Sequence, residues 1–210
     1  MLKVLKRIVQ DVTAADHLSE ALNILVQRIS KAINVEAVSV YLIDSKHAEY
    51  VLIATEGLNK EAQFSARIGL DSGLIGLIGR REEPINLEDA PAHPDFYQHS
   101  LIGEEHLCAF LGVPIIQHRK LYGVLVAQQT ERRCFDDEEE SFLITLAAQF
   151  GGIIAHAEAT GELAELTEPK PVGVTKVEVS QTVLIGVGSV PGIGIGPAVV
   201  VYPQSDIDAV

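Results

Sequence analysis

Histidine and cysteine side chains could bind a metal or act as nucleophiles, and the chain contains seven histidines and two cysteines. His106 and Cys108 alternate, which would place both on one face of a strand and let them share a metal. Two ligands without a nearby third fall short of a zinc site. Two cysteines are also too few for a disulfide framework. We therefore predict no metal site and no catalytic residue, and interpret Cys108 as a small buried hydrophobic side chain.

Short motifs for phosphate, cation or acyl chemistry give no stronger signal. Gly186 and Gly188 begin a dinucleotide-binding pattern, but Pro191 takes the place of its third glycine and no amphipathic helix follows. The acidic run from Asp136 to Glu140 could hold a cation, but carboxylates are also favoured at a helix N-terminus, which is the interpretation we adopt. The sequence contains no Gly-x-x-x-x-Gly-Lys loop, Gly-x-Ser-x-Gly elbow or His-Glu-x-x-His motif.

A pocket for a small molecule is the chemistry that the residues support best. The connection over residues 56–107 is long enough to indicate a function. Its glycines recur at every third position from Gly73 to Gly79, which allows close approach to a sheet or a ligand, and a Pro-rich stretch carries Phe96 and Tyr97. Ligand pockets are mostly apolar and have few polar groups. The alternative for any single side chain is that it completes the core. The predicted pocket residues are Ser39, Tyr41, Arg67, Leu74, Ile75, Ile78, Arg80, Phe96, His99 and Phe110.

The composition excludes several classes of protein. The chain has 210 residues, of which 47% are hydrophobic, and a formal net charge of −13. This apolar content predicts a sizeable core and excludes a disordered chain. The acidic excess repels nucleic acid and anionic lipid. No apolar run approaches the roughly 20 residues of a membrane helix, and the N-terminus lacks the features of a signal peptide. We predict a cytoplasmic protein that binds neither nucleic acid nor a membrane.

Helical periodicity appears near both ends of residues 1–160. Apolar side chains recur every three or four positions over residues 18–33, with Asp16 as the predicted N-cap. A shorter helix is expected over residues 2–10. A long helix is predicted over residues 136–160, because Asp136 and Glu139 have the spacing of a capping box.

The two sides of the long helix over residues 136–160 differ in size. Its bulky side chains are predicted to pack on the sheet, and its small residues would suit a second helix at short range. That second helix belongs either to another copy in a homodimer or to the chain's own N-terminal region. At about 1.5 Å per residue the helix would span roughly 37 Å, so it could carry a displacement away from the sheet. The predicted interface residues are Ala148, Gly151, Gly152 and Ala155.

Strand patterns fill the middle of the chain. Residues 37–44 and 50–55 are expected to form an antiparallel hairpin, and residues 110–117 and 121–129 a second one that is apolar throughout and therefore central. Another strand is predicted over residues 64–68, followed by a short helix after Asp71.

The last 50 residues have a different character. Glycines and prolines over residues 161–176 indicate a linker. The β-rich segment over residues 177–210 is too short to bury a core of its own. We interpret it as the truncated start of a further domain.

Five segments, taken in order, resemble the successive blocks of a GAF domain. This resemblance covers residues 1–160 and implies an α+β fold: a central antiparallel sheet of five to six strands, with the N- and C-terminal helices on one face and short connecting helices on the other. The Asn-Lys pair of cyclic-nucleotide-binding GAF domains is missing after the strand that ends Ala127-Gln-Gln. The segments are Asp71-Ser-Gly-Leu-Ile-Gly, Pro84-Ile-Asn-Leu-Glu-Asp-Ala with Pro94-Asp-Phe, Leu111-Gly-Val-Pro-Ile, Leu121-Tyr-Gly-Val-Leu and Arg133-Cys-Phe-Asp-Asp-Glu.

The segment from Val190 to Tyr202 resembles the first strand segment of Enzyme I of the phosphoenolpyruvate phosphotransferase system. A GAF domain before it resembles the nitrogen-related branch of that family. The resemblance implies a regulatory GAF domain, control by glutamine and 2-oxoglutarate, and phosphotransfer from phosphoenolpyruvate through a downstream histidine to a small phosphocarrier protein, with magnesium in the complete enzyme. The Ser-His phosphorylation motif and the phosphoenolpyruvate barrel are absent from this sequence, so we expect these residues alone to be inactive and to hold no cofactor.

Three hypotheses remain at this point. The first is a sensor module in which a small effector, such as glutamine or 2-oxoglutarate, alters the packing of the helix over residues 136–160. The second is a ligand-free interaction module that forms a homodimer. The third is a haem or redox sensor that uses His106 and Cys108, as in some GAF relatives.

Overall fold

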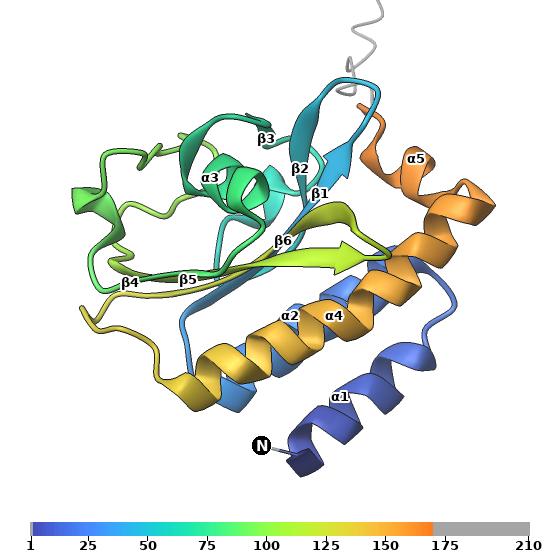
Figure 1. Ribbon diagram of the computed structural model, residues 1–210, viewed down its shortest axis with the longest axis horizontal. Coiled ribbons are helices and arrows are strands. Elements are labelled where there is room, and N and C mark those ends of the chain that lie inside the picture. The colour runs from blue at the N-terminus through green and yellow to red at the C-terminus, as the bar shows by residue number, and fades with distance from the viewer. Residues whose placement is uncertain (1, 170–210) are drawn as a thin grey trace, which may run out of the picture. The chain divides into compact units, whose positions relative to one another are not determined.

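The computed structural model describes residues 2–169, which form an antiparallel sheet between two layers (Figure 1). The sheet has six strands in the order β3-β2-β1-β6-β5-β4, and every neighbouring pair is antiparallel. This confirms the predicted GAF fold. The strands are β1 (Ala37–Asp44), β2 (Glu49–Glu56), β3 (Arg67–Gly69), β4 (Ile85–Leu87), β5 (Ala109–Gln117) and β6 (Lys120–Gln129).

The terminal helices cover one face of the sheet and α3 (Gly73–Arg81) covers the other (Figure 1). Helices α2 and α4 pack directly on the strands, and α1 packs against α2 and α4. The long connections also contain two short 3-10 turns, η1 (Lys60–Ala62) and η2 (Ala90–Ala92). The helices of the first face are α1 (Leu2–Thr13), α2 (Leu18–Ile33), α4 (Asp137–Thr160) and α5 (Glu162–Thr167).

The alternation of side chains along the strands divides the interior into two cores. On β1, Val38 and Val40 join the core under the terminal helices, whereas Ala37 and Tyr41 join the core under α3. Successive side chains of a strand point to opposite faces, so one apolar strand supplies both cores. The second core, between the sheet and α3, contains several of the residues that were predicted to line a ligand pocket.

Helix α4 begins with the predicted capping box. The Asp136 carboxylate accepts the Glu139 N–H at 2.8 Å, and the Glu139 carboxylate accepts the Asp136 N–H at 2.9 Å. Arg133 donates to both carboxylate oxygens of Glu139, at 2.6 and 2.8 Å. By length and composition alone α4 could cross a membrane, but 44% of its most apolar 18-residue stretch is buried inside the protein. Its bulky side chains pack on the sheet, so α4 is a core helix of this fold.

The small residues of α4 do not all share one open face. Gly151 is buried against the end of β5, where an added Cβ would lie 3.0 Å from the Ile116 carbonyl oxygen. The placement of Gly151 on an outer interface is therefore wrong, because α4 needs a small residue here to approach the strand. Ala148 and Gly152 are exposed, and Ala155 is half-buried.

Local predictions required correction at three places. The N-cap of α2 is His17 rather than Asp16, and it makes no side-chain cap bond. The strand predicted from residue 64 begins only at Arg67, since Phe64 adopts a φ of 64°. The predicted linker begins with a helix, because Gly161, with a φ of 87°, ends α4 and the chain continues directly into α5. The rest of that linker and the segment over residues 177–210 lie outside the described residues.

Candidate ligand cavity

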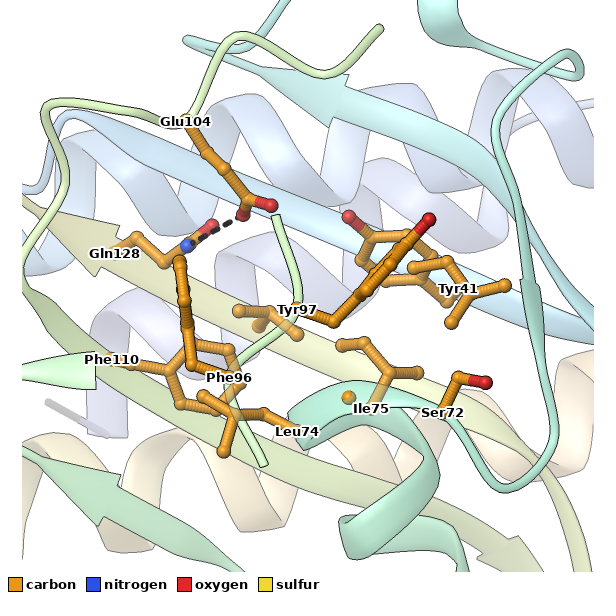
Figure 2. Close-up of a pocket in the computed structure, with 12 residues that line it drawn as sticks. Tyr41, Ser72, Leu74, Ile75, Phe96, Tyr97, Glu104, Phe110 and Gln128 are labelled. Carbon is orange, nitrogen blue, oxygen red and sulfur yellow. Dashed lines mark hydrogen bonds between the residues drawn. The ribbon is translucent and has the colours of Figure 1, made fainter. Parts of the chain in front are cut away.

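A small cavity lies between the sheet, the start of α3 and the connection from β4 to β5 (Figure 2). Strands β1, β5 and β6 form its floor, α3 forms one wall, and the stretch around residues 96–104 closes it. The side chains are mostly apolar, with a few polar groups toward the closing stretch. The lining residues are Tyr41, Ile68, Ser72, Gly73, Leu74, Ile75, Phe96, Tyr97, Glu104, Phe110, Val126 and Gln128.

The cavity is small and partly open to solvent. The space inside is about 20 Å³. That is enough for about one water molecule and is far below the roughly 300 Å³ of an ordinary metabolite pocket. Figure 2 shows Phe96 and Tyr97 lying across the space in front of the sheet residues. Admission of a metabolite therefore requires these two side chains to move.

Tyr41 on β1 is one of two polar groups on the floor of the cavity; the other is Gln128 on β6. A bulge in the pairing of β1 with β2 falls just before Tyr41, and its ring is buried. Burial raises the pKa of its hydroxyl, and the nearby charge of Glu104 acts in the same direction. Tyr41 therefore keeps its proton and can donate a hydrogen bond to a ligand.

Among the described residues that line the cavity, Glu104 is the one with a charged side chain, and none is a lysine or an arginine. Its Oε2 atom accepts a hydrogen bond from Gln128 Nε2 at 3.2 Å. Burial raises the pKa of Glu104, and the hydrogen bonds from Gln128 and from the backbone of His99 oppose that shift. A carboxylate held in this way is suited to a partner that brings a positive charge and N–H donors.

The glycines of α3 serve packing more than ligand contact. Gly79 faces the Tyr50 side chain on β2, and Gly76 lies against the backbone of Asp71. Only Gly73, with a φ of 65°, lines the cavity, where an added Cβ would lie 3.1 Å from Tyr97 Cβ. The glycine spacing left open whether the close approach is to the protein or to a ligand. The contacts of these three glycines are with the protein itself.

The structure brings half of the predicted pocket residues to the cavity. Ser39 is buried on β1 and its Oγ lies 3.5 Å from Thr55 Oγ1. Ile78 belongs to the core under α3, and His99 is a half-buried neighbour of Tyr97 in the closing stretch. Those that line the cavity are Tyr41, Leu74, Ile75, Phe96 and Phe110.

The two predicted arginines bind elsewhere. Arg80 donates to the Asp71 carbonyl at 2.7 Å, on the outside of α3. Arg67 points to the opposite face of the sheet and pairs with Asp44 at 2.9 Å. Glu104 and Gln128 line the cavity although neither was predicted from the sequence. Glu104 lies in a connection without periodicity, so nothing in the sequence marks its direction.

The candidate metal ligands His106 and Cys108 belong to no larger ligand cluster within the described residues. Within residues 2–169 no three histidine, cysteine, aspartate or glutamate side chains are grouped so that they could hold a metal. His106 is exposed, and Cys108 is half-buried rather than fully buried as predicted.

The GAF domain family matches residues 17–154. Together with the sheet order and the cavity, this shows that the chain belongs to the GAF domain family. The GAF domain of a phosphoenolpyruvate-protein phosphotransferase from Coxiella burnetii is 48% identical, with a TM-score of 0.74; the match covers 76% of this chain and 95% of that one. The corresponding Acinetobacter domain is 41% identical, with a TM-score of 0.70 and coverage of 76% and 96%.

The chain also matches part of longer phosphotransferase system proteins. A phosphoenolpyruvate-dependent phosphotransferase system protein of Salmonella typhimurium is 49% identical over 160 residues, which is 76% of this chain. The match spans only 21% of that relative's length. The described residues are thus a GAF domain of the phosphoenolpyruvate-protein phosphotransferase type, and the activity of the whole relatives does not follow from them.

Proposed function

We propose that this GAF domain is a regulatory sensor that binds a small nitrogen metabolite in the cavity and controls a phosphoenolpyruvate-protein phosphotransferase of the nitrogen-related branch. The observation that carries the proposal is a small, largely apolar cavity with Glu104, Gln128 and Tyr41 in its wall. The family of the two matching phosphotransferase GAF domains supports the regulatory context. A cytoplasmic location and phosphotransfer from a histidine to a phosphocarrier protein belong to this proposal for the complete enzyme.

The charges of the cavity favour glutamine over 2-oxoglutarate as the effector. Glutamine is a zwitterion without net charge: Glu104 would accept hydrogen bonds from its ammonium group, Gln128 would pair with its amide, and the Tyr41 hydroxyl could donate to its single carboxylate. 2-Oxoglutarate carries two carboxylates, and the cavity offers no arginine or lysine to balance them. An uncompensated charge in a closed site is costly. We therefore propose glutamine, or an amino acid of similar shape, as the bound molecule.

Binding requires the closing stretch to open. Its backbone bonds near the aromatic side chains are local, as in the Phe96 N–H to His93 carbonyl bond at 2.9 Å. Its far end is held more firmly, because Asn59 bonds to the carbonyl oxygens of Leu101 and Ile102, each at 3.0 Å. The ligand would select the open arrangement in proportion to its differential affinity for the two states.

Isothermal titration of the 210-residue chain with glutamine and with 2-oxoglutarate tests the proposal. We expect heat and a thermal shift with glutamine, and about tenfold weaker binding in Glu104→Gln, because a hydrogen bond to a charged group is lost. Glu105→Gln is the matched control, since the neighbouring Glu105 is exposed and outside the cavity. The absence of heat and of a thermal shift with both compounds would overturn the ligand proposal.

A homodimer is the second candidate function, and the surface of α4 favours it. Apart from the adjoining residues of α4 itself, nothing described lies within 4 Å of a Cβ added to Gly152, and Ile144 on the same helix is exposed. A second helix could approach closely there. We expect Gly152→Leu to dissociate the dimer in sedimentation without unfolding the chain. A wild type that stays monomeric at high concentration would refute this candidate.

Magnesium is implied by the phosphoenolpyruvate chemistry of the complete enzyme. The residues described here do not fit such a site, because they contain no suitable cluster of carboxylates. No step of the proposed sensing passes through a metal.

A further inference from the structure

A polar cluster closes the end of the β1–β2 hairpin around the buried Asp44 carboxylate. Asp44 Oδ2 accepts from Arg67 Nη1 at 2.9 Å and lies 2.6 Å from His47 Nδ1. Asp44 Oδ1 accepts the backbone N–H groups of Lys46 and His47, at 3.0 and 3.2 Å. Burial alone would raise the pKa of Asp44, but these hydrogen bonds outweigh it and lower that pKa.

Arg67 extends this cluster to the last helix of the described residues. Its Nη2 donates to the carbonyl oxygen of Thr167 at 2.6 Å, and Thr167 is the buried final residue of α5. The carbonyl groups at a helix C-terminus lack partners within the helix and favour a positive charge. Arg67 therefore holds the end of α5 against the hairpin. The exposed ion pair of Lys46 with Glu168, at 3.0 Å, adds a second tie at the surface.

The other end of α5 is held independently. Glu162 Oε1 accepts the N–H of Leu18 at 2.7 Å, which satisfies a donor at the start of α2. Gly161, in a left-handed conformation, separates α5 from α4. The C-terminal end of α5 can thus leave the hairpin while its N-terminal end stays in place.

Arg67 is also one residue away from the cavity. Arg67 and Ile68 are successive residues of β3, so their side chains point to opposite faces: Ile68 lines the cavity and Arg67 reaches α5. Strand β3 has three residues, lies at the edge of the sheet and, within residues 2–169, pairs with β2 alone. Ser72 and Gly73, which follow it closely, line the same cavity. A displacement of this short edge strand therefore reaches both sites.

We propose that Arg67 couples the cavity to α5: a change at the cavity wall formed by β3 shifts Arg67 and thereby docks or releases the end of α5. Any part of the protein that follows α5 in sequence is attached through this helix, so its attachment would depend on the state of the cavity. The inference rests on the proposed sensing function for its physiological trigger. It does not require α4, which is packed along the sheet, to move as a rod.

Hydrogen exchange on the 210-residue chain tests this coupling without any ligand. The amide groups of Glu165 and Glu168 bond to the carbonyl oxygens of Gly161 and Ala164, and they exchange when α5 opens. Two truncations of the cavity wall form a matched pair, since Ile68 is 6% and Leu74 is 5% exposed. We expect Ile68→Ala to speed exchange in α5 by at least about threefold, and Leu74→Ala on α3 to leave it unchanged. Ile68→Val is the milder variant if Ile68→Ala does not fold.

A second set of variants in the same hydrogen-exchange experiment removes the arginine itself. We expect Arg67→Gln to speed exchange in α5 about tenfold, and Lys46→Gln to have little effect. In the Arg67→Gln background, Ile68→Ala should add nothing further in α5. The coupling is overturned if Ile68→Ala leaves α5 unchanged, or if Leu74→Ala speeds α5 equally. Because no ligand is used, failure of glutamine to bind would leave these outcomes intact.

Discussion

Replacement of Asp44 by alanine gives the largest loss of stability that we expect from a single polar substitution. The Asp44 side chain is 4% exposed and its Arg67 partner 18% exposed, so the two charges are paired largely away from water. Removing one partner of a buried pair leaves the other charge uncompensated, which costs about 3–5 kcal/mol. Arg67 keeps its contacts with Glu49 and the Thr167 carbonyl. The expected loss therefore lies near the lower end, at about 3 kcal/mol.

Urea unfolding followed by circular dichroism measures this loss, and the chain supplies its own control. The Asp71–Arg80 pair has the same residue types at 3.6 Å, but the Asp71 side chain is 88% exposed. Asp71→Ala should cost less than about 1 kcal/mol, because exposed ion pairs contribute little. Similar losses for Asp44→Ala and Asp71→Ala, both below about 1 kcal/mol, would refute the argument that burial gives the Asp44 cluster its strength.

Three further predictions concern stability and its dependence on pH. The pKa of Asp44 is lowered in the folded state, so its contribution to the free energy of unfolding is fully present above the unfolded pKa of about 3.9 and is lost as the pH falls through the folded value. The urea midpoints at pH 6 and pH 3 should therefore differ less in Asp44→Asn than in the wild type. Gly152→Ala should stabilise α4 by up to about 1 kcal/mol in urea unfolding, whereas Gly151→Ala should gain less or lose, because its Cβ would crowd β5. Asp136→Ala should cost about 1 kcal/mol through loss of the α4 cap, and an unchanged midpoint would contradict that role.

Release of the closing stretch is the central physical requirement of the proposed sensor. With Phe96 and Tyr97 in place the cavity holds about 20 Å³, so an observed metabolite complex must differ from this arrangement at those side chains. The exposure of Tyr97, at 55%, is consistent with a segment that is lightly held.

The sequence by itself determined most of the elements. The helix over residues 18–33 and the start of α4 at Asp136 follow from local patterns, because apolar spacing and a capping box act within a few turns of the chain. The two hairpins follow from alternation and from tight polar turns. The order of the segments that resemble GAF blocks indicated the family, and with it the layers of the fold.

Only the tertiary structure decided which side chains meet. Arg67 and Ile68 are neighbours in the sequence, yet one binds α5 and the other lines the cavity, because a strand divides its side chains between two faces. The surroundings of Gly151 and Glu104 could not be predicted from the sequence either. Gly151 depends on how α4 meets β5, and Glu104 on the path of an irregular connection, and both are set by distant residues. Local chemistry fixes an element, whereas the direction of a side chain within the fold is set by everything that packs around it.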